Sequence, residues 1–408
     1  MQIRPILAAL RHHKAGTLLI ALQIALTLAI VCNALFIIHE RLTRLSQPSG
    51  IDEPSLLVIH NGWAGKPQDD EIASLMASDL DTLRKIPGVA DVYATNTYPL
   101  NNGGIAYGIG HSPDKLKPVT STAIYFADEN ALSTLGLKLV AGRNFRPDEI
   151  GQIGSHGDTQ PSAIIVTSAL AKLLFPDGSA VGKVAYISSK PSTIIGVVER
   201  MRSPWVDSSL AKWADCSTLI PYRLLTSKTH YVVRVQPGQL ENVTSHVRAT
   251  LYAANRMRVI SPKDGVQTFA DVRAIAYNSD RGMAILMSAI SMILLIITGA
   301  GIVGLTSFWV GQRRKQIGVR RALGATRHDI LSYFLTENLL IGAGGVVMGG
   351  VLAVALNMWL MKQFEMDKLA PGYVITGVVT LLLLGQGAVL APALRASNVP
   401  PVEATRSV

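Results

Sequence analysis

Four long apolar stretches divide the chain, and each is long enough to cross a lipid bilayer, which takes about 20 apolar residues. The first covers residues 15–38 and the second residues 282–312, and neither contains a charged side chain. The third covers residues 331–361 and the fourth residues 369–394. The pattern predicts four transmembrane helices. Because the second stretch has 31 residues, more than one crossing needs, we expect its N-terminal part to project from the membrane as a helix.

Residues 39–281 lie between the first two stretches and alternate β-rich and helical patterns. The predicted strands are Leu56–His60, Val89–Tyr98, Ala163–Thr167, Thr193–Val198 and Tyr231–Val235. The predicted helices are Asp70–Lys85, Ser168–Leu174 and Leu240–Ala254. Two separated β-α-β units that flank a middle segment indicate a large α+β domain of two lobes. We place the inserted lobe at about residues 118–215.

The net charge of +10 follows the apolar pattern. Residues 40–280 contain 24 Lys/Arg and 23 Asp/Glu, whereas the remainder contains 14 and 5. A nucleic-acid-binding domain would show a basic face instead, so no nucleic-acid partner is expected. The positive-inside rule places an N-terminal segment (1–14), the loop 313–330 and a tail (395–408) in the cytoplasm, and residues 39–281 outside.

The basic segment between the second and third stretches predicts a helix, a corner and a second helix. Residues 312–323 form the short helix, with Ile317, Ala322 and Leu323 as its apolar positions. Gly324 suits a left-handed helix stop. Thr326 and Asp329 have the spacing of an N-terminal capping box that starts the next helix at once. A rigid basic elbow of this kind can be pushed by a cytoplasmic protein.

The segment RRKQIGVRRALGAT, followed by a glycine-rich apolar helix with an early Glu337, resembles MacB/FtsX-type ABC transporter permeases. Gln316 stands where that family usually has Glu. Further segments resemble MacB-type sequences in the same order along the chain: Gly136–Phe145, Leu174–Lys183 with Ile194–Val198, and Ala391–Ala404. The resemblance implies an inner-membrane protein of four transmembrane α-helices, with a large MacB-like α+β periplasmic core domain between the first two and an FtsX-like membrane domain.

The resemblance also implies a permease subunit that works as a homodimer or heterodimer. A separate ABC ATPase subunit would bind ATP and Mg²⁺, and the permease would couple ATP hydrolysis to periplasmic motions that export a substrate. A periplasmic adaptor and an outer-membrane channel are further partners that the family uses. Since Ile317 and Leu323 have no evident core in so short a loop, we assign them to a groove on the ATPase; the alternative places them in the lipid interface. The residues expected at this contact are Ile317, Gly318, Arg320, Arg321, Ala322, Leu323, Gly324 and Ala325.

The sequence contains no recognisable motif for catalysis or for metal binding. The segment Gly178–Lys183 has three residues between its glycines and Val184 after the lysine, whereas a phosphate loop needs four residues and a Ser or Thr. His39 and Glu40 begin a zinc-protease pattern, but Thr43 occupies the position of the second histidine. We therefore expect no catalytic residue, metal site or cofactor in this chain, and an ATPase that is a separate subunit.

Three further features concern the membrane stretches. Glu337 is an acidic residue at membrane depth, where a charge is costly and often functional. Because it lies near the cytoplasmic interface, we favour the alternative that it pairs with Arg320, Arg321 or Arg327. Gly345 and Gly349 form a small-xxx-small pair that predicts close helix packing. The first stretch is longer than the core of a cleaved signal peptide, which predicts an uncleaved anchor.

Two other functions stay open at this point. One is a lipoprotein-releasing or FtsX-like permease, although the outward domain, residues 39–281, is larger than that of FtsX-like chains. The other is a membrane sensor or resistance component that signals without transport.

Overall fold

The structure is a computed structural model that describes residues 14–65, 67–114, 117–154, 157, 160–364 and 368–398. The basic residues of the predicted cytoplasmic termini lie outside the described residues, except Lys14 and Arg395. The chain divides into two compact units. The membrane unit comprises residues 1–46 and 279–408, and the α+β unit comprises residues 47–278.

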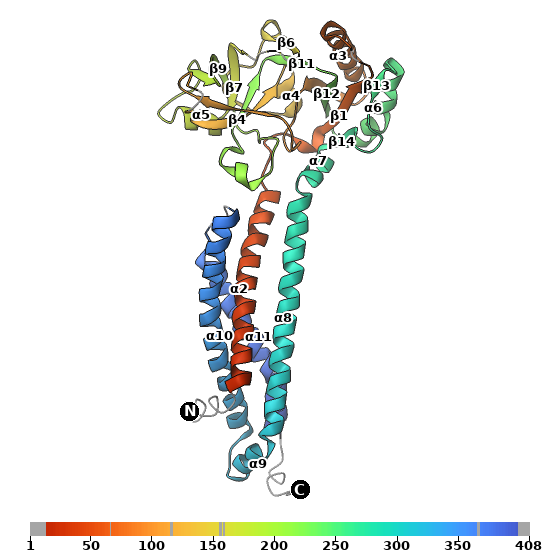
Figure 1. Ribbon diagram of the computed structural model, residues 1–408. Helices are drawn as coiled ribbons and strands as arrows, with labels where there is room; N and C mark the ends of the chain where they lie inside the picture. The colour runs from red at the N-terminus through yellow and green to blue at the C-terminus, as the bar shows by residue number, and fades with distance from the viewer. Residues whose placement is uncertain are drawn as a thin grey trace. The chain divides into compact units, whose positions relative to one another are not determined.

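The membrane unit contains the four helices that the hydropathy pattern predicts, each long and apolar enough to cross a bilayer (Figure 1). They are α2 (Lys14–Leu45), α8 (Asn278–Gln312), α10 (Arg327–Phe364) and α11 (Pro371–Ser397). A short helix, α9 (Arg314–Ala322), connects α8 to α10. The second apolar stretch continues as one helix of 35 residues, about 52 Å at 1.5 Å per residue, which is longer than one bilayer crossing needs.

Helix α2 packs against α10 and α11, and glycines allow the closest approach. A Cβ atom at Gly345 would lie 2.9 Å from the carbonyl oxygen of Ala21, and one at Gly349 would lie 2.8 Å from that of Ala25. Both glycines therefore face the α2 backbone. Polar side chains add contacts between the membrane helices. The hydroxyls of Thr27 and Thr298 are 2.8 Å apart and join α2 to α8.

The first lobe of the α+β unit is an antiparallel sheet in the order β13-β1-β12-β2, with β14 also paired to β1. Its strands are β1 (Leu56–Trp63), β2 (Val89–Thr95), β12 (Lys228–Val235), β13 (Arg258–Val259) and β14 (Val266–Thr268). Apolar residues of α3 (Asp69–Arg84) and α6 (Leu240–Ala254) form a core with this sheet. The two predicted β-α-β units therefore combine into one sheet. Helix α7 (Phe269–Ala276) follows β14 and precedes α8.

The second lobe is a mixed sheet in the order β5-β9-β7-β10-β4-β3-β8. Its strands are β3 (Ile105–Gly110), β4 (Thr120–Phe126), β5 (Leu139–Gly142), β7 (Ala163–Thr167), β8 (Val184–Ile187), β9 (Lys190–Val198) and β10 (Ser217–Ile220). Helix α5 (Ser168–Leu174) packs against β7 and β9 of this sheet, whereas α4 (Ala131–Leu135) contacts β2 and β12 of the first lobe. Strand β6 (Gly151–Gly154) pairs with β11 (Tyr222–Leu225).

This sheet extends beyond the predicted insert of 118–215 at both ends. Strand β3 pairs antiparallel with β4, and β10 pairs parallel with β4 on its other side. The sequence did not indicate either strand, because β3 is rich in glycine and a four-residue strand such as β10 carries little pattern of its own.

Candidate functional site

The elbow, residues 312–330, places α9 between α8 and α10 and has a sharply defined corner. Gly324 has a φ of 96°. The amides of Gly324 and Ala325 donate to the carbonyls of Arg321 and Arg320 over 3.2 and 3.0 Å. These two bonds make a Schellman motif, in which the left-handed residue is commonly glycine. The predicted helix stop is thereby confirmed.

The next helix starts with the predicted capping box. The Asp329 amide donates to the Thr326 hydroxyl oxygen over 3.2 Å, and the Thr326 amide donates to the Asp329 carboxylate over 2.9 Å. A capping box satisfies two backbone donors that the helix itself leaves without partners. The corner is therefore held by backbone geometry on one side and by a reciprocal cap on the other, which makes it stiff.

Three arginines attach the elbow to the neighbouring helices. Both oxygens of Glu337 accept from Arg313 Nη1 over 3.0 Å, and the two side chains are 3% and 11% exposed. The Arg320 guanidinium lies 5.0 Å from the centre of the Tyr333 ring, and Arg321 donates to the Ser397 carbonyl at the end of α11. The predicted partners of Glu337 were therefore wrong. Arg320 and Arg321 are occupied elsewhere, and Arg313 at the α8–α9 junction reaches the carboxylate instead.

The apolar residues of α9 separate into a buried side and an exposed side. Ile317 is 5% exposed and packs with Ile330 and Phe334 in the core of the membrane unit. The expectation that Ile317 lacks a core within the chain was wrong, because α9 folds back onto the first turns of α10. Leu323, in contrast, is 84% exposed, and Val319 is 44% exposed.

The exposed side of α9 forms a small apolar surface at the tip of the elbow. Val319 and Leu323 are four residues apart, which places them on the same face of a helix, with Ala322 also exposed beside them. We call Val319, Ala322 and Leu323 the elbow tip. Sequence reasoning missed Val319, although its spacing from Leu323 was a usable signal. Of the residues expected at a partner, Ile317 and Gly318 are buried, whereas Ala322, Leu323 and Gly324 are accessible.

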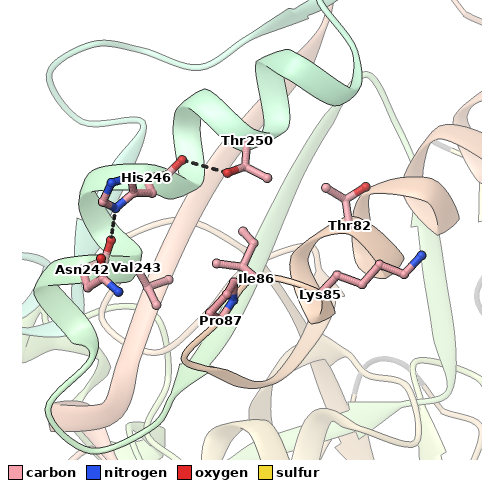
Figure 2. Close-up of a pocket in the computed structure, with 8 residues that line it drawn as sticks. All are labelled: Thr82, Lys85, Ile86, Pro87, Asn242, Val243, His246 and Thr250. Carbon is pink, nitrogen blue, oxygen red and sulfur yellow. Dashed lines mark hydrogen bonds between the residues drawn. The ribbon is translucent and has the colours of Figure 1, made fainter.

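The α+β unit has a groove of about 480 Å³ beside α3 and α6 (Figure 2). It is lined by Thr82, Lys85, Ile86, Pro87, Asn242, Val243, His246 and Thr250. Several of its polar groups already have local partners. His246 Nδ1 lies 2.8 Å from the Asn242 carbonyl oxygen, Thr250 donates to the His246 carbonyl, and Lys85 pairs with Asp81. A small-molecule site needs polar groups that converge on the ligand. The polar groups named above bind within the chain and do not converge on a ligand, so the elbow is the candidate functional site and the groove is not.

Histidines 60 and 230 lie directly opposite each other on β1 and β12, with ring centres 4.8 Å apart. His60 Nε2 lies 2.7 Å from the Tyr98 hydroxyl oxygen. Burial and the neighbouring His60 lower the pKa of His230 to about 4. In the described part of the chain, no three His, Cys, Asp or Glu side chains are grouped so that they could hold a metal ion.

Comparison with known proteins matches segments of both units to known protein families. Residues 17–250, more than half of the chain, match the MacB-like periplasmic core domain. The chain belongs to this family. Residues 288–401 match the C-terminal domain of FtsX-like permeases, and this match includes the elbow. The resemblance drawn from the sequence is confirmed. The chain is a multi-pass inner-membrane protein of the MacB/FtsX permease family, and its α+β unit is periplasmic.

Similar proteins include two named "Macrolide export ATP-binding/permease protein MacB". The one from Agrobacterium fabrum is 27% identical over 97% of this chain and 59% of its own length. The one from Neisseria gonorrhoeae is 24% identical over 99% of this chain and 60% of its own length. The chain thus spans about 60% of these relatives. A crystal structure of the periplasmic region of MacB from Actinobacillus actinomycetemcomitans aligns with 58% of this chain and 98% of its own, with 17% identity and a TM-score of 0.34.

Proposed function

We propose that this MacB-family chain is the permease part of an ABC transporter that exports a substrate by transmitting motion. ATP hydrolysis by an ABC ATPase partner moves the elbow, and the membrane helices carry that movement to the periplasmic α+β unit. The observation that carries the proposal is the elbow tip. It exposes apolar side chains on a stiff corner whose other side is buried, ion-paired to α10 and hydrogen-bonded to α11.

An exposed leucine on a stiff helix is suited to bind a groove on another protein. Covering the Leu323 side chain with a partner protein is favourable because it removes apolar surface from water. A rigid corner also loses little conformational entropy when it binds. The bound corner then cannot move alone. Ile317 and the Arg313–Glu337 pair connect α9 to α10, so a push on α9 displaces the helices as well.

The remaining parts of the proposal rest on the family. ATP and Mg²⁺ bind to the ATPase partner, as is expected for this type of transporter. The permease functions as a dimer, either of two copies or with a related chain. A periplasmic adaptor and an outer-membrane channel receive the exported substrate. The relatives are named for macrolide export, which makes macrolides the first substrates to test.

Purification of the intact protein from native membranes in a mild detergent tests the proposal. The bound subunits are identified by mass spectrometry, and ATP hydrolysis is measured with and without the permease in lipid vesicles. We expect an ABC ATPase to co-purify and its hydrolysis rate to depend on the permease. A folded permease that repeatedly purifies without any ABC ATPase would contradict the proposal, and a bound histidine kinase would favour sensing instead.

A further inference from the structure

The segment that follows α2, residues 47–53, is bound by arginines from three separate parts of the α+β unit. Arg202, which follows β9 of the second lobe, donates to the side chain of Gln47. Arg234 on β12 of the first lobe donates to Asp52 over 2.9 Å. Arg273 on α7 binds Glu53. The first residues of the α+β unit are therefore tied to both lobes and to the helix that leads back to the membrane.

The Glu53–Arg273 pair is joined by two short hydrogen bonds. Arg273 Nε and Nη2 donate to the two Glu53 oxygens over 2.7 and 2.6 Å, and Nη2 also donates to the Gln47 carbonyl. The side chains are only 19% and 24% exposed. Burial by itself raises the pKa of Glu53, but hydrogen bonds from Arg273 and Ser49 outweigh it and leave the pKa below its ordinary value. A two-pronged, charge-assisted pair of this kind fixes orientation as well as distance.

The position of this pair in the chain gives it a mechanical meaning. Glu53 lies shortly after α2, and Arg273 lies on α7, shortly before α8. Tyr277 ends α7, so α7 and α8 are two helices and not one. Bending at this joint would absorb a displacement of α8. The membrane unit has a matching contact, because Arg41 on α2 pairs with Asp280 on α8 over 2.5 Å, and Asp280 is 5% exposed.

We propose that the Glu53–Arg273 pair fastens the two chain segments that connect α2 and α8 to the α+β unit, so that both helices move this unit as one body. The pair is a positioning element, and its role rests on the proposed function. Without this pair, a displacement of α8 would bend the joint at Tyr277, and the two lobes would not move with the helix.

Electron paramagnetic resonance distances in the full-length protein with its ATPase test this inference. One spin label is placed on α2 by Leu42→Cys and the other on α6 by Glu241→Cys, both exposed positions. The native Cys32 and Cys216 are buried and leave these two sites as the ones that react. The width of the distance distribution without nucleotide reports on the fastening, and its shift with ATP reports on the proposed function.

Charge reversal and charge exchange form the variant set. Glu53→Arg and Arg273→Glu should each broaden the distribution and lose the shift with ATP, whereas the double exchange should restore both. The control is Arg143→Glu, which breaks a comparable arginine–glutamate pair with Glu149 inside one periplasmic loop. It should leave width and shift unchanged. Thermal unfolding confirms that each variant is folded, and Glu53→Gln takes the place of a reversal that fails to fold.

The outcomes separate the two ideas. A folded reversal with an unchanged width would overturn the fastening role, and so would a control that broadens equally. A wild-type protein that shows no shift with ATP would contradict the proposed function, while the widths of the reversals would still decide on the ion pair.

Discussion

Replacing Leu323 by Asp separates docking of the elbow tip from folding of the chain. The side chain is 84% exposed, so the substitution removes almost no packing within the chain itself. The neighbouring corner depends on the φ of Gly324 and on the Thr326–Asp329 cap, and neither involves the leucine side chain. We therefore expect normal membrane insertion and an unchanged unfolding temperature.

The expected loss appears only in binding to the ATPase. Full burial of a leucine side chain stabilises a complex by about 1.5–3 kcal/mol. Because Leu323 is exposed in the chain by itself, most of this free energy is available for binding the ATPase. A loss of about 2 kcal/mol weakens the complex roughly 30-fold. An aspartate in an apolar groove adds the cost of desolvating a charge, so this value is a lower bound. Val319→Asp should have a smaller effect, since only 44% of Val319 is exposed.

The assay is a titration of the purified ATPase into the detergent-solubilised permease, together with transport in lipid vesicles. Leu173→Asp is the matched control, because Leu173 is a 49% exposed leucine on the periplasmic helix α5. It should bind the ATPase like the wild type. If Leu323→Asp retains wild-type affinity and transport, the elbow tip does not contact the ATPase. The alternative of a side chain dipped into the lipid interface would then be favoured.

Three further predictions concern stability and packing. Arg258→Met should cost about 3–5 kcal/mol in unfolding experiments, because it leaves the buried Asp79 without its 2.7 Å partner, and adding Asp79→Leu should recover part of the loss. Since the pKa of His230 is about 4 in the folded chain and about 6.5 when unfolded, only the unfolded state takes up a proton between these values. Stability should fall by about 2 kcal/mol from pH 7 to pH 5, and His230→Gln should remove most of this dependence in thermal scans. Gly349→Leu should lower the unfolding temperature because even its Cβ would press on α2, whereas Gly344→Leu, which has open space, should not.

Local patterns were enough to predict the membrane helices and the corner of the elbow. In lipid, a polypeptide must satisfy its backbone hydrogen bonds internally, so an apolar stretch of about 20 or more residues becomes a helix whatever surrounds it. The helix stop at Gly324 and the cap of Thr326 with Asp329 depend on residues within five positions of each other. Segments such as Ala163–Thr167 and Leu240–Ala254 were predicted with their observed bounds for the same reason.

The tertiary structure decided which side chains meet. The charge pattern offered three arginines for Glu337, but the carboxylate binds Arg313, because the stacking of Arg320 on Tyr333 and the bond from Arg321 to α11 direct those two elsewhere. Glu53 and Arg273 are 220 residues apart, and only the folded α+β unit brings them within 2.6 Å. Hydrophobic periodicity specifies elements one at a time. The contact of two distant charges depends on how all the intervening elements pack, and that information is not present in any local stretch of the chain.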